Sequence, residues 1–336
     1  MLKPKEKTVL KLDRQVTTVR YSPCGRFLMA GGFESVIYRW DNELKTLPPL
    51  KGHGGWVQCL AFSSDKKTLF SADSWGQLRA WDYANGKTMW KHDQAHDGWI
   101  RALAVSPDGK MIATSAADQK VCLWSVDGKK IREHSHSEDI FCLAFHPEGK
   151  SLVFGDLKGK IEQRNVKSGK MERSLDASVL FKLHRLQDVG GARVLQFNER
   201  GDTLACAGTT PKNGGNVQGV PTMLFFDWKS GEVKHTIKIG TTSDVYVHDL
   251  HLQGDVVFAV TSGNPGVGKF FIQKLGEAAP MFLSTKMSNC HSLAMHPDGK
   301  QFVISATNRG SNGNGRRLNK KKEYEGNSSP LHVWTV

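Results

Sequence analysis

The sequence predicts an all-β fold in which seven four-stranded antiparallel blades form a ring, a seven-bladed β-propeller. Three observations support this fold. A turn of the SPDG type recurs along the chain, strands that end in Trp follow several of these turns, and 34 of the 336 residues are Gly. Tight turns between short strands favour Gly, and a repeat of about 40–45 residues is the period of four-stranded propeller blades.

The recurring turn connects the first strand of each blade to the second. Its copies read YSPCG at 21–25, FSSDK at 62–66, VSPDG at 105–109, FHPEG at 145–149, FNERG at 197–201, a degenerate LQGDV at 252–256 and MHPDG at 295–299. The predicted blades 1 to 7 cover approximately 16–50, 56–93, 99–135, 139–177, 191–241, 245–284 and 289–336 plus 7–13. Because such repeats bury their faces only against their neighbours, we expect a single domain over 1–336.

Trp marks the end of the third strand in four of the copies. It occurs in RWD at 39–41, AWD at 80–82, LWS at 123–125 and VWT at 333–335, whereas RNV at 164–166, FDW at 226–228 and QKL at 273–275 stand there in copies four to six. Together with the turns, these motifs resemble the WD-repeat β-propeller family, as a stand-alone propeller, over essentially the whole chain. The resemblance implies a ring that binds partners on one face.

Each strand of a blade has the composition that its place requires. The first strand, for example VQCLAF at 57–62, is mostly apolar on both faces, which is typical of a strand packed between sheets. The second strand, for example IATSAAD at 112–118, carries small residues that let the next blade approach. The Trp of the third strand fills space between blades.

The seventh copy ends at Val336, directly after its third strand, and lacks a fourth. Residues 8–13 (TVLKLD) read as a short strand that belongs to no other blade. We expect this strand to pair with the last blade, which would close the ring and remove its open sheet edges.

The resemblance also implies a buried hydrogen-bond network in some blades. It joins a His before the first strand, a Ser or Thr on the second strand, an Asp in the following turn and the Trp of the third strand. In blade 3 the matching residues are His96, Thr114, Asp118 and Trp124.

Two other blades match this pattern less completely. Blade 2 supplies His53, Ser71 and Trp81 but has Trp75 at the Asp position, so the resemblance predicts an incomplete network there. Blade 4 keeps His136 but has Lys158 and Arg164 at two of the other positions.

Composition limits the function classes. The six Cys are scattered without a CxxC pair, which favours buried free thiols in a reducing intracellular compartment, cytoplasmic or nuclear. No stretch approaches 18 apolar residues, so no membrane association is expected. The net charge of +13 and the isoelectric point of about 9.4 are explained either by a binding partner or by a contribution of the charge to solubility.

The sequence predicts neither an enzyme nor a cofactor site. GNPGVGK at 263–269 looks like the start of a phosphate-binding loop, but Phe270 stands where a Ser or Thr would hold Mg²⁺, and FFIQKL reads as a strand. The 13 His include no HExxH motif or Cys/His quartet, so no metal site is predicted. No nucleophile elbow is visible.

Long insertions are expected on one face of the ring. Residues 209–221, 262–269 and 308–330 expand the turn between second and third strands in blades 5 to 7, and 176–190 lengthens the connection between blades 4 and 5. This connection is expected to contain one helical turn around 180–186. Connections of more than about 12 residues are usually functional or disordered, and for 308–330 a mobile, solvated loop is an open alternative.

The same face is expected to gather exposed Trp and basic residues. Trp56 and Trp99 directly precede first strands, Trp75 lies in a turn of blade 2, and aromatic residues of this size are frequent at binding hot spots. The alternative is that these rings only pack against adjacent loops. The candidate partner-binding residues are Trp56, Trp75, Trp99, Arg309, Arg316, Arg317, Lys320, Lys321 and Lys322.

Two functions fit these observations. The first is a non-catalytic scaffold, a monomeric propeller within a larger complex, that binds a protein or peptide on the face with the long loops of blades 5 to 7. The alternative is a nucleic-acid-binding propeller, or a subunit of a ribonucleoprotein or chromatin-type assembly. In that case the basic loop 308–330, with Lys182, His184, Arg185 and Lys212, would contact phosphates.

Overall fold

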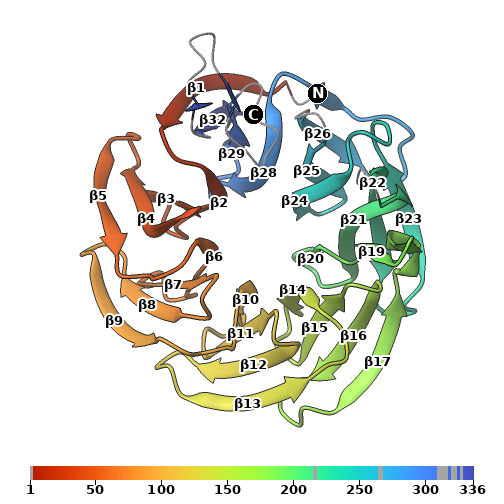
Figure 1. The fold of residues 1–336 in the computed structure, drawn as a ribbon, viewed down its shortest axis with the longest axis horizontal. Helices are drawn as coiled ribbons and strands as arrows, with labels where there is room; N and C mark the ends of the chain where they lie inside the picture. The colour runs from red at the N-terminus through yellow and green to blue at the C-terminus, as the bar shows by residue number, and fades with distance from the viewer. Residues whose placement is uncertain (1–2, 215–217, 264–267, 309–316, 319–323, 326–327) are drawn as a thin grey trace.

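Seven four-stranded antiparallel sheets are arranged as blades around a central axis, as the sequence predicts (Figure 1). The computed structural model describes residues 3–214, 218–263, 268–308, 317–318, 324–325 and 328–336. Over these residues the single helix is the three-residue 3₁₀ turn η1 (Ser178–Leu180), and none is long and apolar enough to cross a membrane.

The strands follow the chain in regular order through blades 1 to 4. Blade 1 holds β2 (Val16–Tyr21), β3 (Phe27–Gly32), β4 (Glu34–Asp41) and β5 (Thr46–Lys51); blade 2 holds β6 (Val57–Phe62), β7 (Thr68–Asp73), β8 (Leu78–Asp82) and β9 (Lys87–His92). Blade 3 holds β10 (Ile100–Val105), β11 (Met111–Ala116), β12 (Lys120–Ser125) and β13 (Lys130–Ser135); blade 4 holds β14 (Ile140–Phe145), β15 (Ser151–Asp156), β16 (Lys160–Asn165) and β17 (Met171–Asp176).

Blades 5 to 7 carry the additional elements. Blade 5 holds β20 (Val194–Phe197), β21 (Thr203–Asn213), β22 (Gln218–Asp227) and β23 (Val233–Lys238), preceded by the hairpin β18 (Phe181–His184) and β19 (Gln187–Gly190). Blade 6 holds β24 (Tyr246–Gln253), β25 (Val256–Ser262), β26 (Gly268–Lys274) and β27 (Phe282–Ser284). Blade 7 holds β28 (Ser288–Met295), β29 (Gln301–Thr307), β32 (Ser329–Thr335) and β1 (Lys5–Leu12), with the short pair β30 (Arg317–Leu318) and β31 (Tyr324–Glu325) between β29 and β32.

The recurring turn is a compact hydrogen-bonded loop. In blade 3 the backbone N–H of Gly109 donates to the carbonyl of Ser106 at 2.8 Å, and Gly109 has a φ of 68°. This left-handed conformation explains the Gly at the last position, since a side chain there is strained. In blade 2 Lys66 takes that position with a φ of 62°.

Apolar clusters between adjacent blades form the core. All six residues of β7 are buried, and Phe70 and Ala80 of blade 2 share a cluster with Ile112 and Trp124 of blade 3. Each fully buried large apolar side chain contributes about 1.5–3 kcal/mol relative to exposure. Since the clusters bridge blades, the free energy of folding is shared around the ring.

The N-terminal strand closes the ring, as predicted from residues 8–13. Strand β1 pairs antiparallel with β32, with Leu10 opposite Leu331. Its inward side chains Leu10 and Leu12 pack against the cluster that contains Leu331 and Val333. Blade 7 is therefore built from both ends of the chain.

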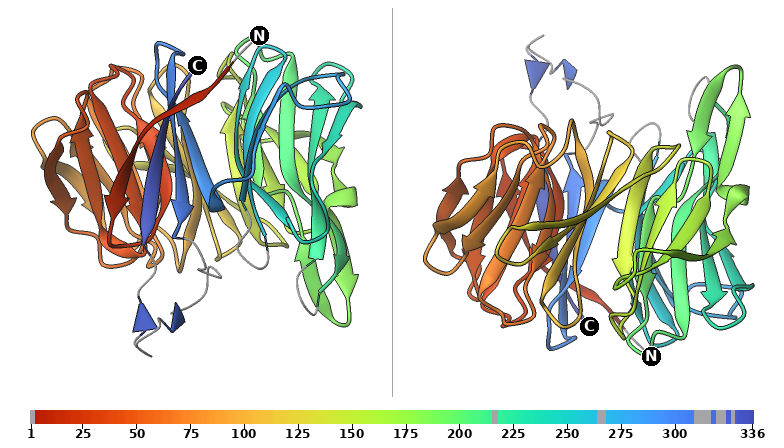
Figure 2. Two further views of the ribbon diagram at one scale, coloured as in Figure 1. Left: turned by 90° about the horizontal axis from the view of Figure 1, so that it is seen from above. Right: turned by 90° about the horizontal axis from the view of Figure 1, so that it is seen from below.

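The extensions of blades 5 and 7 project from one face of the ring (Figure 2). We call this the loop face. Residues 209–213 and 218–221, expected within a loop, instead continue β21 and β22 as paired strands, with Thr209 opposite Pro221. The β-branched Thr and Val residues of this segment favour strand over loop.

The connection between blades 4 and 5 also differs from the expectation. Its helical turn is limited to Ser178–Leu180, and 181–190 form the β18–β19 hairpin rather than helix. The hairpin packs beside β21, where Nζ of Lys182 donates to the carbonyl of Lys212 at 3.0 Å. The β-hairpin forms because Arg185 and Leu186 take positive φ values of 50° and 64°, as a tight two-residue turn requires.

The segment that looked like a phosphate-binding loop leads into a strand, as expected. Residues 264–267 lie outside the described residues, and Gly268 begins β26. Lys269 forms an ion pair with the buried Asp244, so its ammonium already has a carboxylate partner.

Candidate interaction face

The structure joins the four predicted network residues of blade 3. Nδ1 of His96 donates to the Asp118 carboxylate at 3.0 Å, and Nε2 accepts from the Thr114 hydroxyl at 2.7 Å. The Thr114 oxygen in turn accepts from Nε1 of Trp124 at 2.9 Å. Burial opposes ionisation of Asp118, but the hydrogen bonds from His96 and from the backbone N–H groups of Asp97 and Lys120 outweigh it, so the pKa of Asp118 lies below its ordinary value.

Blade 2 has a complete network, and the expectation of an incomplete one is wrong. His53 contacts Ser71 at 2.6 Å and the carboxylate of Asp73 at 2.9 Å, and Trp81 donates to Ser71 at 2.7 Å. Asp73, the last residue of β7, takes the role that Asp118 has in blade 3. Its other carboxylate oxygen accepts hydrogen bonds from the backbone N–H groups of Trp75 and Gln77, which holds it in place. Comparing the blades position by position did not identify Asp73, because its carboxylate lies two residues earlier in the repeat than that of Asp118.

Blade 4 has only the acidic half of such a network. His136 contacts Asp156 at 3.0 Å, and its other ring nitrogen lies 3.8 Å from Glu162. Phe154 stacks edge-on against His136, and Arg164 pairs with Glu162 at 2.6 Å. Lys158 instead pairs with Glu138 at 2.5 Å, outside the network.

Exposed aromatic side chains gather on the loop face of blades 1 to 3. The rings of Phe33 and Trp56 meet edge to face at 4.7 Å, and Trp56 meets Trp99 at 6.5 Å. Phe33 is 36% exposed, Trp56 44% and Trp75 67%. We call Phe33, Trp56, Trp75 and Trp99 the aromatic patch.

The ring of Trp75 lies against the backbone of Gly54 and Gly55, because these two glycines leave room for it. A Cβ at Gly54 would come within 2.7 Å of Cε3 of Trp75, and one at Gly55 within 2.9 Å of Cγ. The indole therefore rests on the Gly54–Gly55 backbone, directly before Trp56. The two glycines of the GGW sequence therefore provide the surface against which the Trp75 ring packs.

The basic residues of 308–330 are not placed in detail. Arg309, Arg316, Lys320, Lys321 and Lys322 lie outside the described residues. Arg317 lies in β30, where only the backbone is described. Their part in partner binding stays a prediction.

Sequence reasoning missed a second group of side chains on the same side of the ring, where the innermost strands of blades 3 to 7 begin. We call these residues the mouth cluster, after their place near the loop-face ends of the strands nearest the centre of the ring: Arg101, Phe141, Arg193, Tyr246, His248 and His291. Each lies near the start of an innermost strand, after the loop-face connection (Figure 1). The signal in the sequence was a polar or aromatic residue at the start of several otherwise apolar first strands.

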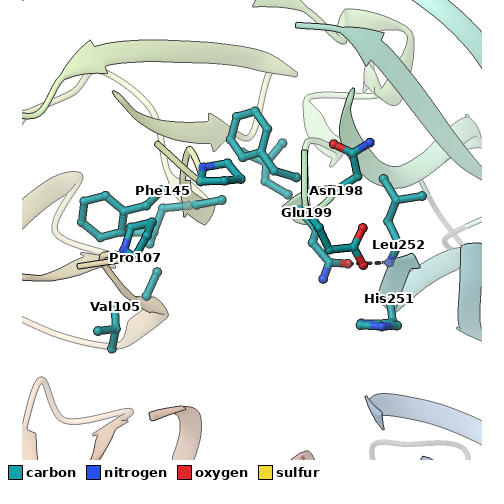
Figure 3. Close-up of a pocket in the computed structure, with 14 residues that line it drawn as sticks. Val105, Pro107, Phe145, Asn198, Glu199, His251 and Leu252 are labelled. Atoms are coloured by element: carbon teal, nitrogen blue, oxygen red, sulfur yellow. Dashed lines mark hydrogen bonds between the residues drawn. The ribbon is translucent and has the colours of Figure 1, made fainter. Parts of the chain in front are cut away.

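The opposite face has a recess of about 490 Å³ between the turns of blades 3 to 6 (Figure 3). Its walls include Val105, Pro107 and Phe145, and several of its polar side chains already accept hydrogen bonds from backbone N–H groups. Glu199 accepts the N–H of Gly254 at 3.0 Å, and burial lowers the pKa of the neighbouring His251. No group of three or more His, Cys, Asp or Glu that could hold a metal ion occurs in the described part of the chain.

Two family models match the chain. The model described as "WD domain, G-beta repeat" matches residues 6–41, and the model described as "Outer membrane protein assembly factor BamB" matches residues 39–271.

The similar curated proteins are much longer than this chain. Telomerase protein component 1 is 26% identical over 341 residues in Mus musculus, which covers 98% of this chain and 11% of that protein. In Rattus norvegicus it is 25% identical over 315 residues, covering 90% and 11%. Protein groucho of Drosophila melanogaster is 29% identical over 158 residues, covering 46% of this chain and 21% of groucho. The chain belongs to the family of the model that matches residues 39–271, and its blade motif, its seven blades and the WD-domain match at 6–41 identify it as a WD-repeat propeller.

Proposed function

We propose that this protein is a non-catalytic interaction scaffold that binds a protein or peptide on its loop face. The aromatic patch is the observation that carries the proposal. The rings of Phe33, Trp56 and Trp99 contact one another across blades 1 to 3, and Phe33, Trp56 and Trp75 are exposed to solvent. Large aromatic side chains dominate the binding energy of many protein interfaces.

The extended elements of blades 5 and 7 support the same face. The β18–β19 hairpin presents Leu183 and Leu186 to solvent, 60% and 96% exposed. WD-repeat relatives suggest a scaffold role, and the name of telomerase protein component 1 describes a part of an assembly. We propose that this chain likewise acts as a monomeric ring within a larger complex, and its six unpaired Cys support a reducing intracellular compartment.

The test is affinity capture with quantitative mass spectrometry, using the Trp56→Ala/Trp75→Ala double variant. Truncating hot-spot residues typically weakens binding by about tenfold or more, so partners recovered with the wild type should be depleted. The matched control is Ile131→Ala/Met171→Ala, which removes exposed apolar side chains from the outer strands β13 and β17. Full recovery of all partners by a folded Trp56→Ala/Trp75→Ala protein would reject the proposed site.

Nucleic-acid binding is the second candidate, favoured by basic residues on the extension of blade 5. Lys182 bonds to Lys212, and His184 accepts the N–H of Gly214 at 3.2 Å, which holds β18 against the tip of β21. Binding to phosphates would weaken steeply with salt because counterions are released. Binding of a mixed-sequence RNA at low salt that is lost in Lys182→Gln/Lys212→Gln would support this candidate, and no binding at low salt would remove it.

A further inference from the structure

The mouth cluster is a continuous chain of side-chain contacts across five successive blades. The Arg101 guanidinium lies 4.5 Å from the ring centre of Phe141, and that of Arg193 lies 3.6 Å from the same ring. Arg193 also lies 5.4 Å from the ring of Tyr246. The chain continues from Tyr246 to His248 at 6.1 Å and from His248 to His291 at 5.4 Å.

The cluster has more positive than negative charge. Arg101 pairs with Asp139 at 3.1 Å, but Arg193 has no carboxylate within ion-pair distance among the described residues. Its Nε donates to the carbonyl of Gly190 at 2.9 Å, and its side chain also forms a hydrogen bond with Tyr246. Since a guanidinium carries five N–H donors, donors remain for a further acceptor. Burial lowers the pKa of Arg193, and the nearby positive charge of Arg101 lowers it further.

The cluster also contains buried polar atoms without a hydrogen-bond partner. These are Nε of Arg101 and Nε2 of His291, within the part of the chain that the structure describes. An unmade bond of a buried polar group costs about 1–3 kcal/mol. Burial lowers the pKa of His291 to about 4, so its ring is neutral at pH 7 and offers one N–H.

These groups select the chemistry of a ligand. Two guanidinium groups repel a cation, and the two His side chains alone are too few for a metal site. A planar guanidinium matches the two oxygens of a carboxylate or phosphate, and such charge-assisted hydrogen bonds are strong. Phe141, between the two Arg side chains, holds them near each other despite their like charge by cation–π contact.

We propose that the mouth cluster binds one anionic group, a carboxylate or a phosphate, that a protein partner presents while docked on the loop face. This inference rests on the proposed function and specifies the chemistry of the partner. A protein is favoured over a nucleic acid because the site offers a single Arg pair, bordered by aromatic rings. Nucleic-acid backbones are usually bound by several phosphate contacts along a strand.

The first arm of the test uses small anions. Inorganic phosphate and N-acetyl-aspartate amide are titrated while the imidazole resonances of His248 and His291 are followed by NMR. Both probes should give saturable shifts in the wild type, and Arg193→Gln should weaken binding by about tenfold or more, since hydrogen bonds to charged groups are among the strong ones. Comparison of the two probes separates a preference for phosphate from one for carboxylate.

Two control variants keep this arm interpretable. Arg193→Lys retains the charge without the planar fork and should bind more weakly than the wild type but better than Arg193→Gln. Arg200→Gln removes an exposed Arg, paired with Asp202, from a turn on the opposite face, and should bind like the wild type. No saturable shift, or equal affinity in Arg193→Gln and the wild type, would overturn the proposal.

The second arm uses a peptide library in which each position is acidic, phosphorylated or neutral. The wild type should select peptides with an acidic or phosphorylated residue, and folded Arg193→Gln should lose that preference while still binding through the aromatic patch. Selection of peptides without regard to charge would overturn the mouth site but leave the scaffold function standing. Anion binding without any peptide binding would instead reject the scaffold function, and an oligonucleotide that alone competes with phosphate would replace the protein partner with a nucleic acid.

Discussion

Blades 3 and 7 place a Trp at the same point of the third strand, but its indole N–H has different surroundings. In blade 3, Trp124 lies opposite Ile112 and donates to Thr114. In blade 7, Trp334 lies opposite Phe302, so that Ile304 takes the place of Thr114. The buried Nε1 of Trp334 has no hydrogen-bond partner among the described residues.

Aromatic packing replaces the network in blade 7. Trp334 stacks on Phe302 with ring centres 6.1 Å apart and planes 5° apart, and contacts Phe270 and Phe282 at 5.9 Å. The difference teaches that the Trp of the repeat is first a packing residue, shared by both blades. The hydrogen-bond network is a separate feature that blade 3 has and blade 7 lacks, while blade 7 depends on β1 for its outer edge.

The largest effect is expected from removing that outer strand. Deletion of 1–13 exposes the edge of β32 and uncovers the cluster that Leu10 and Leu12 pack against. Loss of a single buried Leu side chain typically costs about 2–5 kcal/mol, so loss of the strand should lower the melting temperature of the whole ring, measured by circular dichroism. A melting temperature equal to that of the full chain would show that blade 7 is stable without its closing strand.

A smaller but still large effect is expected from opening the network of blade 3. Asp118→Ala removes the partner of His96 and of the backbone N–H groups of Asp97 and Lys120. Each buried donor left without its acceptor costs about 1–3 kcal/mol, and three donors lose theirs here, so the free energy of unfolding in urea should drop clearly.

The matched variant is Asp156→Ala in blade 4. Glu162 lies near the other nitrogen of His136 there, so the loss should be smaller than in blade 3. Equal losses in the two blades would contradict the view that the four-residue network of blade 3 adds stability beyond a His–Asp pair.

The repeat predicted the ring, the turns and the closing strand because these follow from periodic patterns and from a missing fourth strand. It could not place Asp73, since one carboxylate can reach the same His from the end of a strand or from the turn that follows. It also could not show the mouth cluster. Arg101, Phe141 and Arg193 are far apart in the sequence, and each is unremarkable within its own blade until the ring brings the innermost strands together.

The hairpin extensions were located but given the wrong structure. Glycine and polar residues in 209–221 suggested a loop, yet pairing continues to Asn213 and Gln218. Extended β21 and β22 satisfy each other's backbone groups, which an irregular loop of this length would leave to water.

The smallest effects come from exchanging the residue beneath the Trp in the two blades. Thr114→Val keeps the shape but leaves Nε1 of Trp124 and Nε2 of His96 without their shared partner. The expected loss in unfolding free energy is about 1–3 kcal/mol.

Ile304→Thr does the reverse in blade 7, because it offers a hydroxyl to the unpartnered N–H of Trp334. Its control is Ile304→Val, which shortens the side chain without adding a polar group and costs about 0.5–1.5 kcal/mol. If the blades differ only at this position, Ile304→Thr should cost no more than Ile304→Val in urea unfolding. A clearly larger loss for the Thr variant would mean that the aromatic cluster of blade 7 holds Trp334 where a network cannot form.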